Sequence, residues 1–417
     1  MKILIVGGGG REHVIAWKLK QNARVEKLYA APGNAGIALL AECVPIKATD
    51  LDQLVSFSVE KKLDLVFVAP DDPLALGLVD RLEEAGIKAF GPSQAAARIE
   101  SSKSFAKQLM REKNIPTADY TVFSELEAAL AAVDVASLPL VVKADGLALG
   151  KGVIIAQTRD EARQAVHDML GGSRFGDAGR TIVLEEFLRG PELTVLAFCD
   201  GKTVKPMLSS RDHKRAFDHD RGPNTGGMGA VSPGAKLSEK DWQQMQASIF
   251  QPTLDALRER GTPFSGVIYF GLMLTEQGPK VIEYNARFGD PEAQAILPLL
   301  ETDLLEIIES ILDQKLDTLD IKWSQQASCC VVAASGGYPS SYKKGYPIEG
   351  IDEAERFGLV FQAGTALDQG RIVTSGGRVL CVTAMADTLD QAIDTAYRGM
   401  DCIRFKDRHI RKDIGRT

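Results

Sequence analysis

The sequence predicts a chain of mixed α/β and α+β class that is built from three units. Residues 1–100 alternate between short apolar runs and helical patterns, which is typical of a doubly wound parallel sheet. Residues 117–190 form a smaller α+β block, and a change of composition near 315–327 precedes a last unit rich in turn glycines. At 417 residues, the chain is too long for one ordinary domain. We therefore expect units at 1–100, at 101–326 with the 117–190 block inside it, and at 327–417.

Composition narrows the classes of function. Hydrophobic residues make up 45% of the chain and charged residues 25%, as in ordinary globular proteins. The formal net charge of −7 provides no overall basic field for nucleic acid, and no apolar run approaches the length of a membrane span. The adjacent Cys329 and Cys330 lie in an apolar run, and no C-x-x-C pair occurs, which indicates reduced thiols. The apolar run after Met1 and Lys2 is too short for a signal peptide, so we expect a cytoplasmic protein.

The first unit is expected to contain four strands with helices between them, and those at 3–6 and 65–69 are expected to be buried. The strands are expected at 3–6, 28–30, 65–69 and 88–90, and the helices at 12–20, 51–62 and 74–85. A basic helix is expected next, at 101–113, and ends before Pro116.

The rest of the chain continues with mixed elements. Strands are expected at 138–143, 153–156, 181–186, 193–198, 266–274, 280–285, 328–334 and 379–385. Helices are expected at 161–169, 238–259, 292–313 and 389–403, and residues 209–229 are expected to form a polar loop.

A run of four glycines, Gly7 to Gly10, links the first predicted strand to the first predicted helix. Backbone N–H groups at such a turn attract an anion. A dinucleotide site needs G-x-G-x-x-G and an acid after the second strand, but Glu12 or His13 stands at the sixth position and the acid is missing. We favour the phosphate of another ligand over nicotinamide; a plain structural turn is the alternative.

Lys143 ends an apolar strand and precedes a loop with glycines at 146, 150 and 152. A cation beside a glycine loop is well placed to lie over nucleotide phosphates, and Lys151 could reach the terminal ones. The loop is not a Walker A motif, because Gly152 stands where Ser or Thr is needed. A hairpin with solvated lysines is the alternative.

Two further segments carry unusual densities of charge. Glu185-Glu186-Phe187-Leu188, followed by Glu192, suits a nucleotide, because strand-end backbone can read an adenine edge and carboxylates can accept from the amine or the ribose. Asp212-His213-Lys214-Arg215 places three basic side chains together, which indicates anions between them. The alternatives are a solvated acidic strand end and a disordered loop.

The segment 281–292 passes from an apolar strand into dense polar groups. In an extended chain Glu283, Asn285 and Arg287 share one face. A carboxylate and an amide oxygen are hard ligands that suit Mg²⁺, and an arginine can hold a carboxylate or phosphate by two donors. The segment therefore predicts a place where metal-bound ATP meets an acid; a strand end with a surface ion pair is the alternative.

Together these residues resemble the ATP-grasp fold. The residues that carry this likeness, in order, are Lys103, Lys143 with its glycine loop, Glu185 to Leu188, Glu192 and Glu283-x-Asn285-x-Arg287. Four longer stretches resemble the phosphoribosylamine–glycine ligase family more specifically, and they are 7–13, 212–215, 222–229 and 287–292. The likeness covers essentially the whole chain.

The resemblance implies an ATP-grasp fold with an N-terminal phosphoribosylamine-binding domain, a small lid and a C-terminal α+β domain. It implies that ATP, glycine and 5-phosphoribosylamine give glycinamide ribonucleotide, ADP and phosphate through glycyl phosphate, in de novo purine biosynthesis. The expected cofactors are ATP and Mg²⁺, with Mn²⁺ as an alternative. The expected partners are these small molecules, without nucleic acid or membrane, and we expect a monomer.

The resemblance also implies roles for single residues. ATP phosphates are held by Lys103 and Lys143, the adenine by Glu185 and the backbone of Glu186, Phe187 and Leu188, and the ribose by Glu192. The metal is held by Glu283 and Asn285. Glycine and its acyl phosphate are oriented by Arg287, Asp212, His213, Lys214 and Arg215, and the phosphoribosyl group is held by Gly8, Gly9, Gly10 and Asn34. The residues implied in catalysis are Lys143, Lys151, Arg287, Asp212 and Lys214.

Three positions depart from the family pattern. Asp71 stands where the family usually has Glu, and Arg211 where it usually has Gln. Gly271 stands twelve residues before Glu283, where many ATP-grasp enzymes have a second metal-binding carboxylate. The rival functions are an ATP-grasp ligase or carboxylase for another acid, a nicotinamide-dependent oxidoreductase and, least favoured, a binding module without catalysis.

Overall fold

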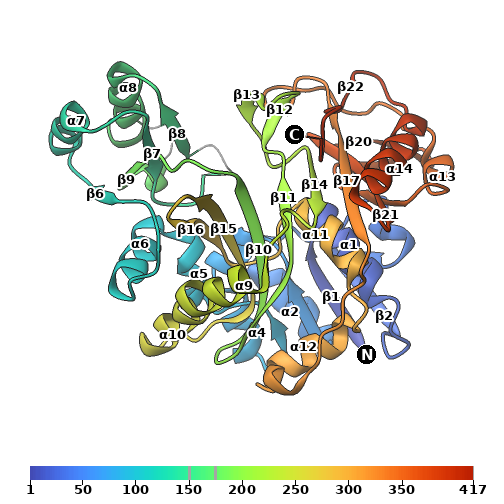
Figure 1. Cartoon of the computed structure of the whole chain (residues 1–417). Coiled ribbons are helices and arrows are strands. Elements are labelled where there is room, and N and C mark those ends of the chain that lie inside the picture. The colour runs from blue at the N-terminus through green and yellow to red at the C-terminus, as the bar shows by residue number, and fades with distance from the viewer. Residues whose placement is uncertain (149–151, 173–175, 417) are drawn as a thin grey trace.

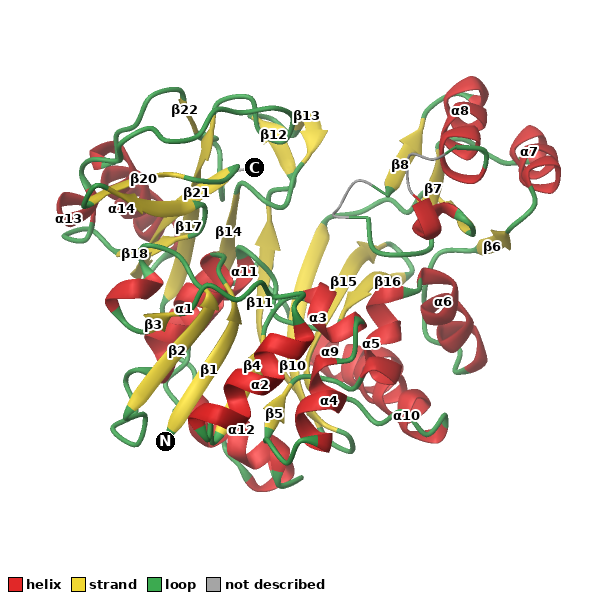
Figure 2. Cartoon of the chain, turned by 180° about the vertical axis from the view of Figure 1, so that it is seen from behind, coloured by secondary structure: helices red, strands yellow, loops and turns green. Residues whose placement is uncertain are grey.

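The computed structural model describes residues 1–148, 152–172 and 176–416. Its N-terminal unit lies at the base of Figure 1, a small unit stands at the upper left, and the C-terminal unit lies at the upper right. Figure 2 shows the same arrangement from behind, with the N-terminal sheet in front. The fold therefore consists of a broad base that carries two upright units with a gap between them.

The N-terminal sheet is parallel, with the strand order β3-β2-β1-β4-β5. The strands are β1 Lys2–Gly7, β2 Lys27–Pro32, β3 Glu42–Cys43, β4 Leu65–Val68 and β5 Ala89–Phe90. The helices are α1 Gly10–Leu19, α2 Leu51–Lys61, α3 Asp71–Ala75 and α4 Leu78–Glu84, with a 3₁₀ turn at Ile37–Leu39. Since the order runs outward in both directions from β1, the predicted doubly wound parallel sheet is confirmed.

The small unit has its own antiparallel sheet and its own apolar core. Its strands, in the order β6-β9-β7-β8, are β6 Tyr120–Phe123, β9 Ile182–Glu186, β7 Leu140–Ala144 and β8 Val153–Ala156. Its helices are α7 Leu126–Val135 and α8 Arg159–Leu170, with a 3₁₀ turn at Gly176–Gly179. Buried residues of both helices and of the sheet form one apolar cluster, which includes Val133, Val166 and Val142. We call this the lid unit.

One large sheet joins the middle of the chain to its end. Its main path is β16-β15-β10-β11-β14-β17-β21-β18, and β22 also pairs with β17. The strands are β10 Glu192–Asp200, β11 Val204–Asp212, β14 Gly229–Ser232, β15 Ser265–Thr275, β16 Gly278–Asn285, β17 Ala327–Ser335, β18 Leu359–Gln362, β21 Arg378–Ala386 and β22 Arg408–His409. Because β14 pairs with β17, the C-terminal unit continues the sheet of the central unit.

Two hairpins and eight helices complete the structure within the described residues. The hairpins are β12 Arg215–Phe217 with β13 Arg221–Asn224, and β19 Thr365–Asp368 with β20 Arg371–Thr374. The helices are α5 Gln94–Ser101, α6 Lys103–Glu112, α9 Glu239–Met245, α10 Gln251–Glu259, α11 Glu292–Ile296, α12 Leu304–Leu312, α13 Ile351–Ala354 and α14 Leu389–Cys402. Shorter helical segments are Gln246–Phe250, Leu297–Leu299 and Leu316–Thr318.

Three predicted elements were wrong. The polar loop at 209–229 contains the end of β11, the β12–β13 hairpin and the start of β14, because its charged residues hide the strand pattern. The single helix at 292–313 is interrupted by a 3₁₀ turn at Leu297–Leu299, and it restarts after Asp303, whose side chain caps Glu306 N. The helix at 74–85 is split at Gly77, which has a φ of +85°.

The helix expected at 101–113 begins later than predicted. Ser102 has an extended backbone and its hydroxyl caps α6 by accepting from Phe105 N. A separate helix, α5, ends one residue earlier, at Ser101. This elbow between α5 and α6 lies at the cavity described below. No helix within the described ranges is both long and apolar enough to cross a bilayer.

Candidate active site

Two adjoining cavities open between the lid unit and the large sheet. One, of about 200 Å³, reaches Asp71, Glu100 and Arg287, and we call it the Arg287 cavity. The other, of about 210 Å³, reaches Phe187 and Met273, and we call it the Phe187 cavity. The residues that line both are Lys143, Val153, Glu185, Lys214, Ile282 and Glu283. The cavities are therefore two halves of one site.

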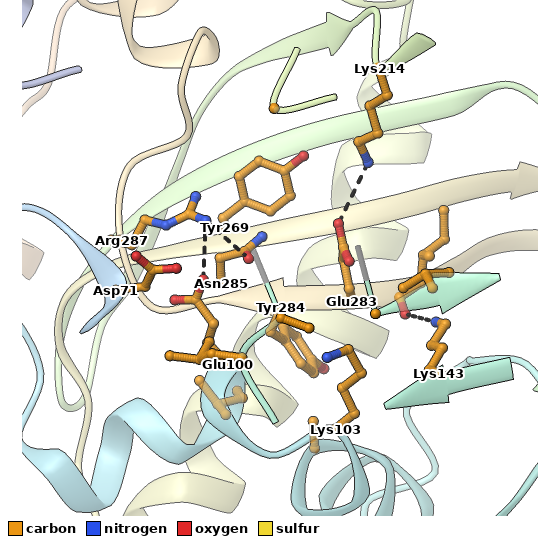
Figure 3. Close-up of a pocket in the computed structure, with 18 of the residues that line it drawn as sticks. Asp71, Glu100, Lys103, Lys143, Lys214, Tyr269, Glu283, Tyr284, Asn285 and Arg287 are labelled. Carbon is orange, nitrogen blue, oxygen red and sulfur yellow. Dashed lines mark hydrogen bonds and ion pairs between the residues drawn. The ribbon is translucent and has the colours of Figure 1, made fainter. Parts of the chain in front are cut away.

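The end of β16 brings Glu283 and Asn285 into the Arg287 cavity. Figure 3 shows Glu283 between Lys214 on one side and Lys103 and Lys143 on the other. Its carboxylate lies 3.5 Å from Lys214 Nζ. Burial opposes ionisation, but Lys214, Lys143 and Lys103 together lower the pKa of the Glu283 carboxyl. Glu283 is therefore an ionised carboxylate surrounded by three lysines. Such a cluster suits a ligand that has both negatively and positively charged groups.

Arg287 is held by the protein on one side and has a free donor on the other. Its Nη2 lies 3.1 Å from Glu100 Oε1 and donates to Asn285 Oδ1 at 3.4 Å (Figure 3). Its Nη1 donates to Phe288 O at 3.2 Å. The buried Nε has no acceptor among the described residues. A buried guanidinium donor without a partner suits the oxygen of an anionic ligand.

The end of β11 brings an acid, Asp212, and a nearby base, Lys214, to the Arg287 cavity. Lys214 lies 3.5 Å from both Glu192 and Glu283. Burial raises the pKa of Asp212 to about 7, and neighbouring acids add to this while Lys214 opposes it. The hydroxyl of Tyr269 bonds to Thr194 Oγ1 at 3.0 Å, and the Tyr269 ring lies in the same cavity (Figure 3). Asp212 and Lys214 are thus brought to the cavity as the sequence predicts.

Lys103 joins the elbow between α5 and α6 to the lid unit. Its Nζ donates to Gly146 O at 3.1 Å, and its backbone N–H donates to Asp145 O. The Asp145 carboxylate accepts from Ser104 N at 2.6 Å. Burial lowers the pKa of Lys103, and Glu283 opposes this shift. The loop that follows β7 is therefore tied to the base of the molecule at its first residues.

Lys143 shares Glu185 with a second lysine. Lys143 Nζ lies 3.0 Å from Glu185 Oε2 and donates to Ile282 O at 3.1 Å. Lys107 Nζ lies 3.0 Å from the same carboxylate oxygen. Two of the three Lys143 donors are used inside the protein, which leaves one for a ligand.

The Phe187 cavity is lined by the predicted adenine-binding segment. Phe187 and Leu188 contribute apolar surface, and Glu186 and Glu192 lie at the same wall. Glu186, the last residue of β9, accepts from Asp119 N at 3.1 Å, which ties the segment to the start of β6. Asn224, at the end of β13, and Thr225 also line this cavity; they belong to the stretch 222–229, for which the sequence did not indicate a place at the nucleotide base. The cavity thus offers apolar surface beside charged and polar groups, a lining that is common in small-molecule sites.

The glycine turn before α1 lies beside the Arg287 cavity, outside its lining. Gly9 N donates to Glu12 Oε2, and Arg11 N donates to Asp290 Oδ2 at 3.4 Å. A Cβ on Gly8 would lie 2.5 Å from Gly33 O, so the turn requires glycine there. The start of α1 therefore already holds two carboxylates of the protein, one of which, Asp290, also lines the cavity.

Asn34 shapes the same region. Its Nδ2 donates to Gly8 O at 2.9 Å and to Gln362 O at 2.8 Å, and its Oδ1 accepts from Gly36 N and Ile37 N at 2.9 Å. All four hydrogen-bonding positions of the amide are thus occupied within the protein.

Two other predicted site residues, His213 and Arg215, do not line the cavities. His213 Nε2 accepts from Gly415 N at 3.2 Å, and Arg215 Nη1 donates to Gly222 O at 2.8 Å, so both side chains serve the C-terminal tail and the hairpin. Burial lowers the pKa of His213 to about 4. Lys151 lies outside the described residues.

Several lining residues were missed at the sequence level. Lys107 follows Lys103 by four residues on α6, and this spacing could have indicated it. Glu100 belongs to α5, on the other side of the elbow at Ser102, so helical spacing does not relate it to Lys103. Asp290 and Arg378 could not be linked from the sequence. Arg378 of β21 donates to Gly226 O at 2.7 Å and to Asp290 O at 2.5 Å, so the C-terminal unit supports the cavity wall.

The donors at the end of β16 fit a divalent cation that a nucleotide brings with it. Glu283 supplies an ionised carboxylate and Asn285 an amide oxygen, both hard ligands. Gly271 pairs directly with Glu283, so the carboxylate of many ATP-grasp enzymes has no counterpart there. Among the described residues, no three His, Cys, Asp or Glu side chains form a metal-binding group. The remaining ligands would have to come from phosphate and water.

Comparisons with known proteins show the family of the chain. Three models of the phosphoribosylglycinamide synthetase family match the chain: the N domain at residues 1–100, the ATP-grasp (A) domain at 101–293 and the C domain at 328–417. A phosphoribosylamine–glycine ligase of Halalkalibacterium halodurans is 50% identical over 415 residues, which is 100% of this chain and 96% of that protein. The enzyme of that name from Escherichia coli O157:H7 is 48% identical, with 100% of this chain and 98% of that protein covered.

Solved structures agree as well. The crystal structure of phosphoribosylamine–glycine ligase from Thermotoga maritima superimposes with a TM-score of 0.88 at 31% identity, over 99% of this chain and 100% of that one. The biotin carboxylase domain of Hydrogenobacter thermophilus 2-oxoglutarate carboxylase, solved with MgADP and bicarbonate, has a TM-score of 0.72 at 14% identity over 98% of this chain and 91% of that one. The second likeness shows the shared fold alone. The chain therefore belongs to the phosphoribosylglycinamide synthetase family and is an ATP-grasp ligase.

Proposed function

We propose that this chain joins glycine to 5-phosphoribosylamine with ATP, giving glycinamide ribonucleotide, ADP and phosphate. The observation that carries the proposal is the end of β16, where Glu283, Asn285 and Arg287 face one cavity. Lys103, Lys143 and Lys214 line the same cavity. This arrangement offers cations for a triphosphate and a guanidinium donor for a small acid.

The chemistry requires an activated acid, because a carboxylate is a poor acyl donor. A carboxylate oxygen of glycine attacks the γ-phosphorus of ATP, the bond to the bridging oxygen breaks, and ADP and glycyl phosphate form. The amine of 5-phosphoribosylamine then attacks the acyl carbon, phosphate leaves with the electron pair of the C–O bond, and the amine loses a proton. No covalent bond to the protein is needed, so the side chains act by positioning and by neutralising charge.

ATP is proposed to span both cavities. Adenine would lie in the Phe187 cavity, with its amine on Glu185, its ring edge on the backbone of Glu186 to Leu188, and its ribose on Glu192. The phosphates would lie on Lys103 and Lys143, with Lys151 of the same loop as a further cation. Bound Mg²⁺, or Mn²⁺ in its place, would be held by Glu283 and Asn285 and would supply charge neutralisation at the phosphates.

Glycine is proposed to bind with its carboxylate on Arg287, beside Asp212 and Lys214. The free Nε of Arg287 supports this assignment. The phosphoribosyl group is proposed to lie toward Gly8, Gly9 and Gly10, with Asn34 holding their turn. Support comes from Asp290, which lines the cavity and also contacts the start of α1. His213 and Arg215 are then proposed to act by holding the strand end that carries Lys214.

The lid unit is proposed to close over the acyl phosphate, because such mixed anhydrides hydrolyse in water. We propose three domains, at 1–100, 101–326 and 327–417. The lid unit, residues 117–190, is part of the central domain and is proposed to move relative to the rest of it. A single chain supplies every residue named here, which supports a monomer. Light scattering of the purified protein tests that state.

The function is tested by measuring ADP release with ATP, 5-phosphoribosylamine and each of several amino acids. Glycine is expected to stimulate release far more than alanine or serine, and Glu283→Ala is expected to abolish it. Glu276→Ala is the matched control, because Glu276 is exposed in the turn between β15 and β16. Strong stimulation by another amino acid would assign the protein to a different ligase, and reduction of NAD with no ADP formed would place it in another class.

A further inference from the structure

Lys107 is a buried cation without a role in the function described so far. It lies on α6, one helical turn after Lys103, and is 2% exposed. Its Nζ lies 3.0 Å from Glu185 Oε2 and donates to Thr117 Oγ1 at 2.7 Å. Thr117 Oγ1 donates in turn to Val281 O at 2.6 Å. The ammonium group is therefore fixed between the lid unit and the large sheet.

The arrangement leaves Glu185 with one occupied and one bare oxygen. Both Lys107 and Lys143 lie 3.0 Å from Oε2. Oε1 is buried and has no donor among the described residues. Glu185 is 3% exposed and lines both cavities. A buried carboxylate oxygen without a donor is unfavourable unless a ligand supplies the donor.

We propose that Lys107 is a positioning residue that sets the choice of purine base by holding Glu185 through Oε2, so that Oε1 accepts from a 6-amino group. The inference rests on the proposed function, because it takes the nucleotide base to lie in the Phe187 cavity. A 6-keto purine presents an oxygen at the same place, and two acceptors then face each other without a proton between them. A site built to accept a hydrogen bond rejects such an analogue strongly.

Because Lys107 and Lys143 both contact Glu185 Oε2, they also determine the orientation of an amide side chain placed at position 185. In Glu185→Gln the amide oxygen is expected to stay on Lys107 and Lys143, because an ammonium group only donates. The amide NH₂ then occupies the Oε1 position and donates. The variant is therefore expected to prefer a 6-keto purine, and this inversion depends on Lys107.

The test compares kcat/KM for ATP and for ITP, which share ribose and phosphates and differ in the base at position 6. The wild-type enzyme is expected to prefer ATP by about 100-fold or more. Lys107→Met is expected to reduce this preference at least tenfold, and Glu185→Gln to reverse it. In the double variant of both residues the reversal is expected to disappear.

Two further variants complete the design. Lys113→Met is the control, because Lys113 follows α6 and pairs with Glu259 at the surface, and it is expected to keep the wild-type ratio. Thr117→Val removes an acceptor of Lys107 and is expected to lower the preference about threefold. If Lys107→Met does not fold, Thr117→Val and Glu185→Gln decide the matter.

A purely structural role gives a different result. If Lys107→Met or Thr117→Val lowers kcat/KM by the same factor for both nucleotides, or if Glu185→Gln keeps the preference for ATP, the proposal is overturned. Glycine-dependent ADP release by the wild-type enzyme would then still stand, so the proposed function would survive. If the wild-type enzyme shows no glycine-dependent release of ADP from ATP or of IDP from ITP, both proposals fall.

Discussion

Glu100 Oε1 lies 3.1 Å from Arg287 Nη2, and the other oxygen of Glu100 accepts from Ala286 N at 2.7 Å. The Glu100 carboxylate thus contacts both the Arg287 guanidinium and the backbone N–H of the preceding residue, Ala286. Burial raises the pKa of Glu100, which Arg287 opposes. Glu100 is the penultimate residue of α5 and lies three residues before Lys103, so one acid connects the proposed phosphate-binding elbow to the proposed glycine-binding arginine.

Glu100→Ala is expected to raise the KM for glycine at least about tenfold, because loss of one partner of a buried ion pair frees Arg287 to turn away from the cavity. The KM for ATP is expected to change less than about threefold, since adenine and ribose contacts remain. Glu100→Gln keeps an acceptor for Ala286 N and is expected to have the smaller effect. Steady-state kinetics for each substrate, with thermal unfolding as a check on folding, test this. Equal increases in both KM values would indicate general distortion.

Arg378→Met is expected to lower kcat/KM for glycine about 10-fold to 100-fold, although Arg378 belongs to the C-terminal unit. Its guanidinium donates to Gly226 O and Asp290 O and lies 3.3 Å from Asp290 Oδ1. Gly226 and Asp290 both line the Arg287 cavity, so their displacement reaches the reacting groups. The control is Arg371→Met, on the exposed side of the β19–β20 hairpin. Wild-type kinetics in Arg378→Met would show that the C-terminal unit does not support the cavity.

The fold could be predicted where apolar pattern and burial coincide. The run at 3–6 and the run at 65–69 are buried strands of a parallel sheet, as their continuous hydrophobicity indicates. The pairing of β14 with β17 could not be predicted, because it joins segments almost 100 residues apart and β14 is short and rich in small residues. Non-local pairing of this kind has no local sequence signal.

For the site, too, some features could be predicted from the sequence and others could not. Glu283, Asn285 and Arg287 could be placed on one face, since a strand alternates its side chains. The contact between Glu100 and Arg287 could not be foreseen, because a helix end and a strand end meet only in the folded chain. His213 lies next to Lys214 in the sequence, yet its ring faces Gly415 while Lys214 reaches the cavity. Successive side chains at a strand end point to opposite sides, so His213 and Lys214 lie in different surroundings although they are adjacent in the sequence.

Removal of divalent cations is expected to abolish ADP release while the temperature of unfolding changes little. Glu283 already lies 3.5 Å from Lys214 Nζ, so its charge is balanced without a metal. Activity in the presence of EDTA, and its recovery on addition of excess Mg²⁺, measure the first effect; thermal unfolding measures the second. In Glu283→Ala added Mg²⁺ is expected not to restore activity. Full activity in EDTA would rule out the proposed metal.

The protein is expected to lose stability in mild acid through His13. The ring lies between the N-terminal and C-terminal units, and its Nδ1 accepts from Gln362 N at 2.8 Å. Burial lowers the pKa of His13 to about 4, from a usual value of 6.5. Between these two values the unfolded chain binds a proton that the folded chain does not, so stability falls as the pH decreases from 6.5 toward 4. At pH 5 the loss is about 2 kcal/mol, from one pKa unit being ~1.4 kcal/mol.

His13→Gln keeps an acceptor for Gln362 N without a group that titrates in this range. The free energy of unfolding in urea is expected to decrease less between pH 7.5 and pH 5 in this variant than in the wild type. Some decrease should remain, because burial also lowers the pKa of His213 to about 4. His167→Gln, at an exposed position of α8, is the control and should follow the wild type. If the free energy of unfolding decreases equally in His13→Gln and in the wild type, His13 is protonated in the folded protein at no cost in stability. That result would contradict the effect expected from its burial.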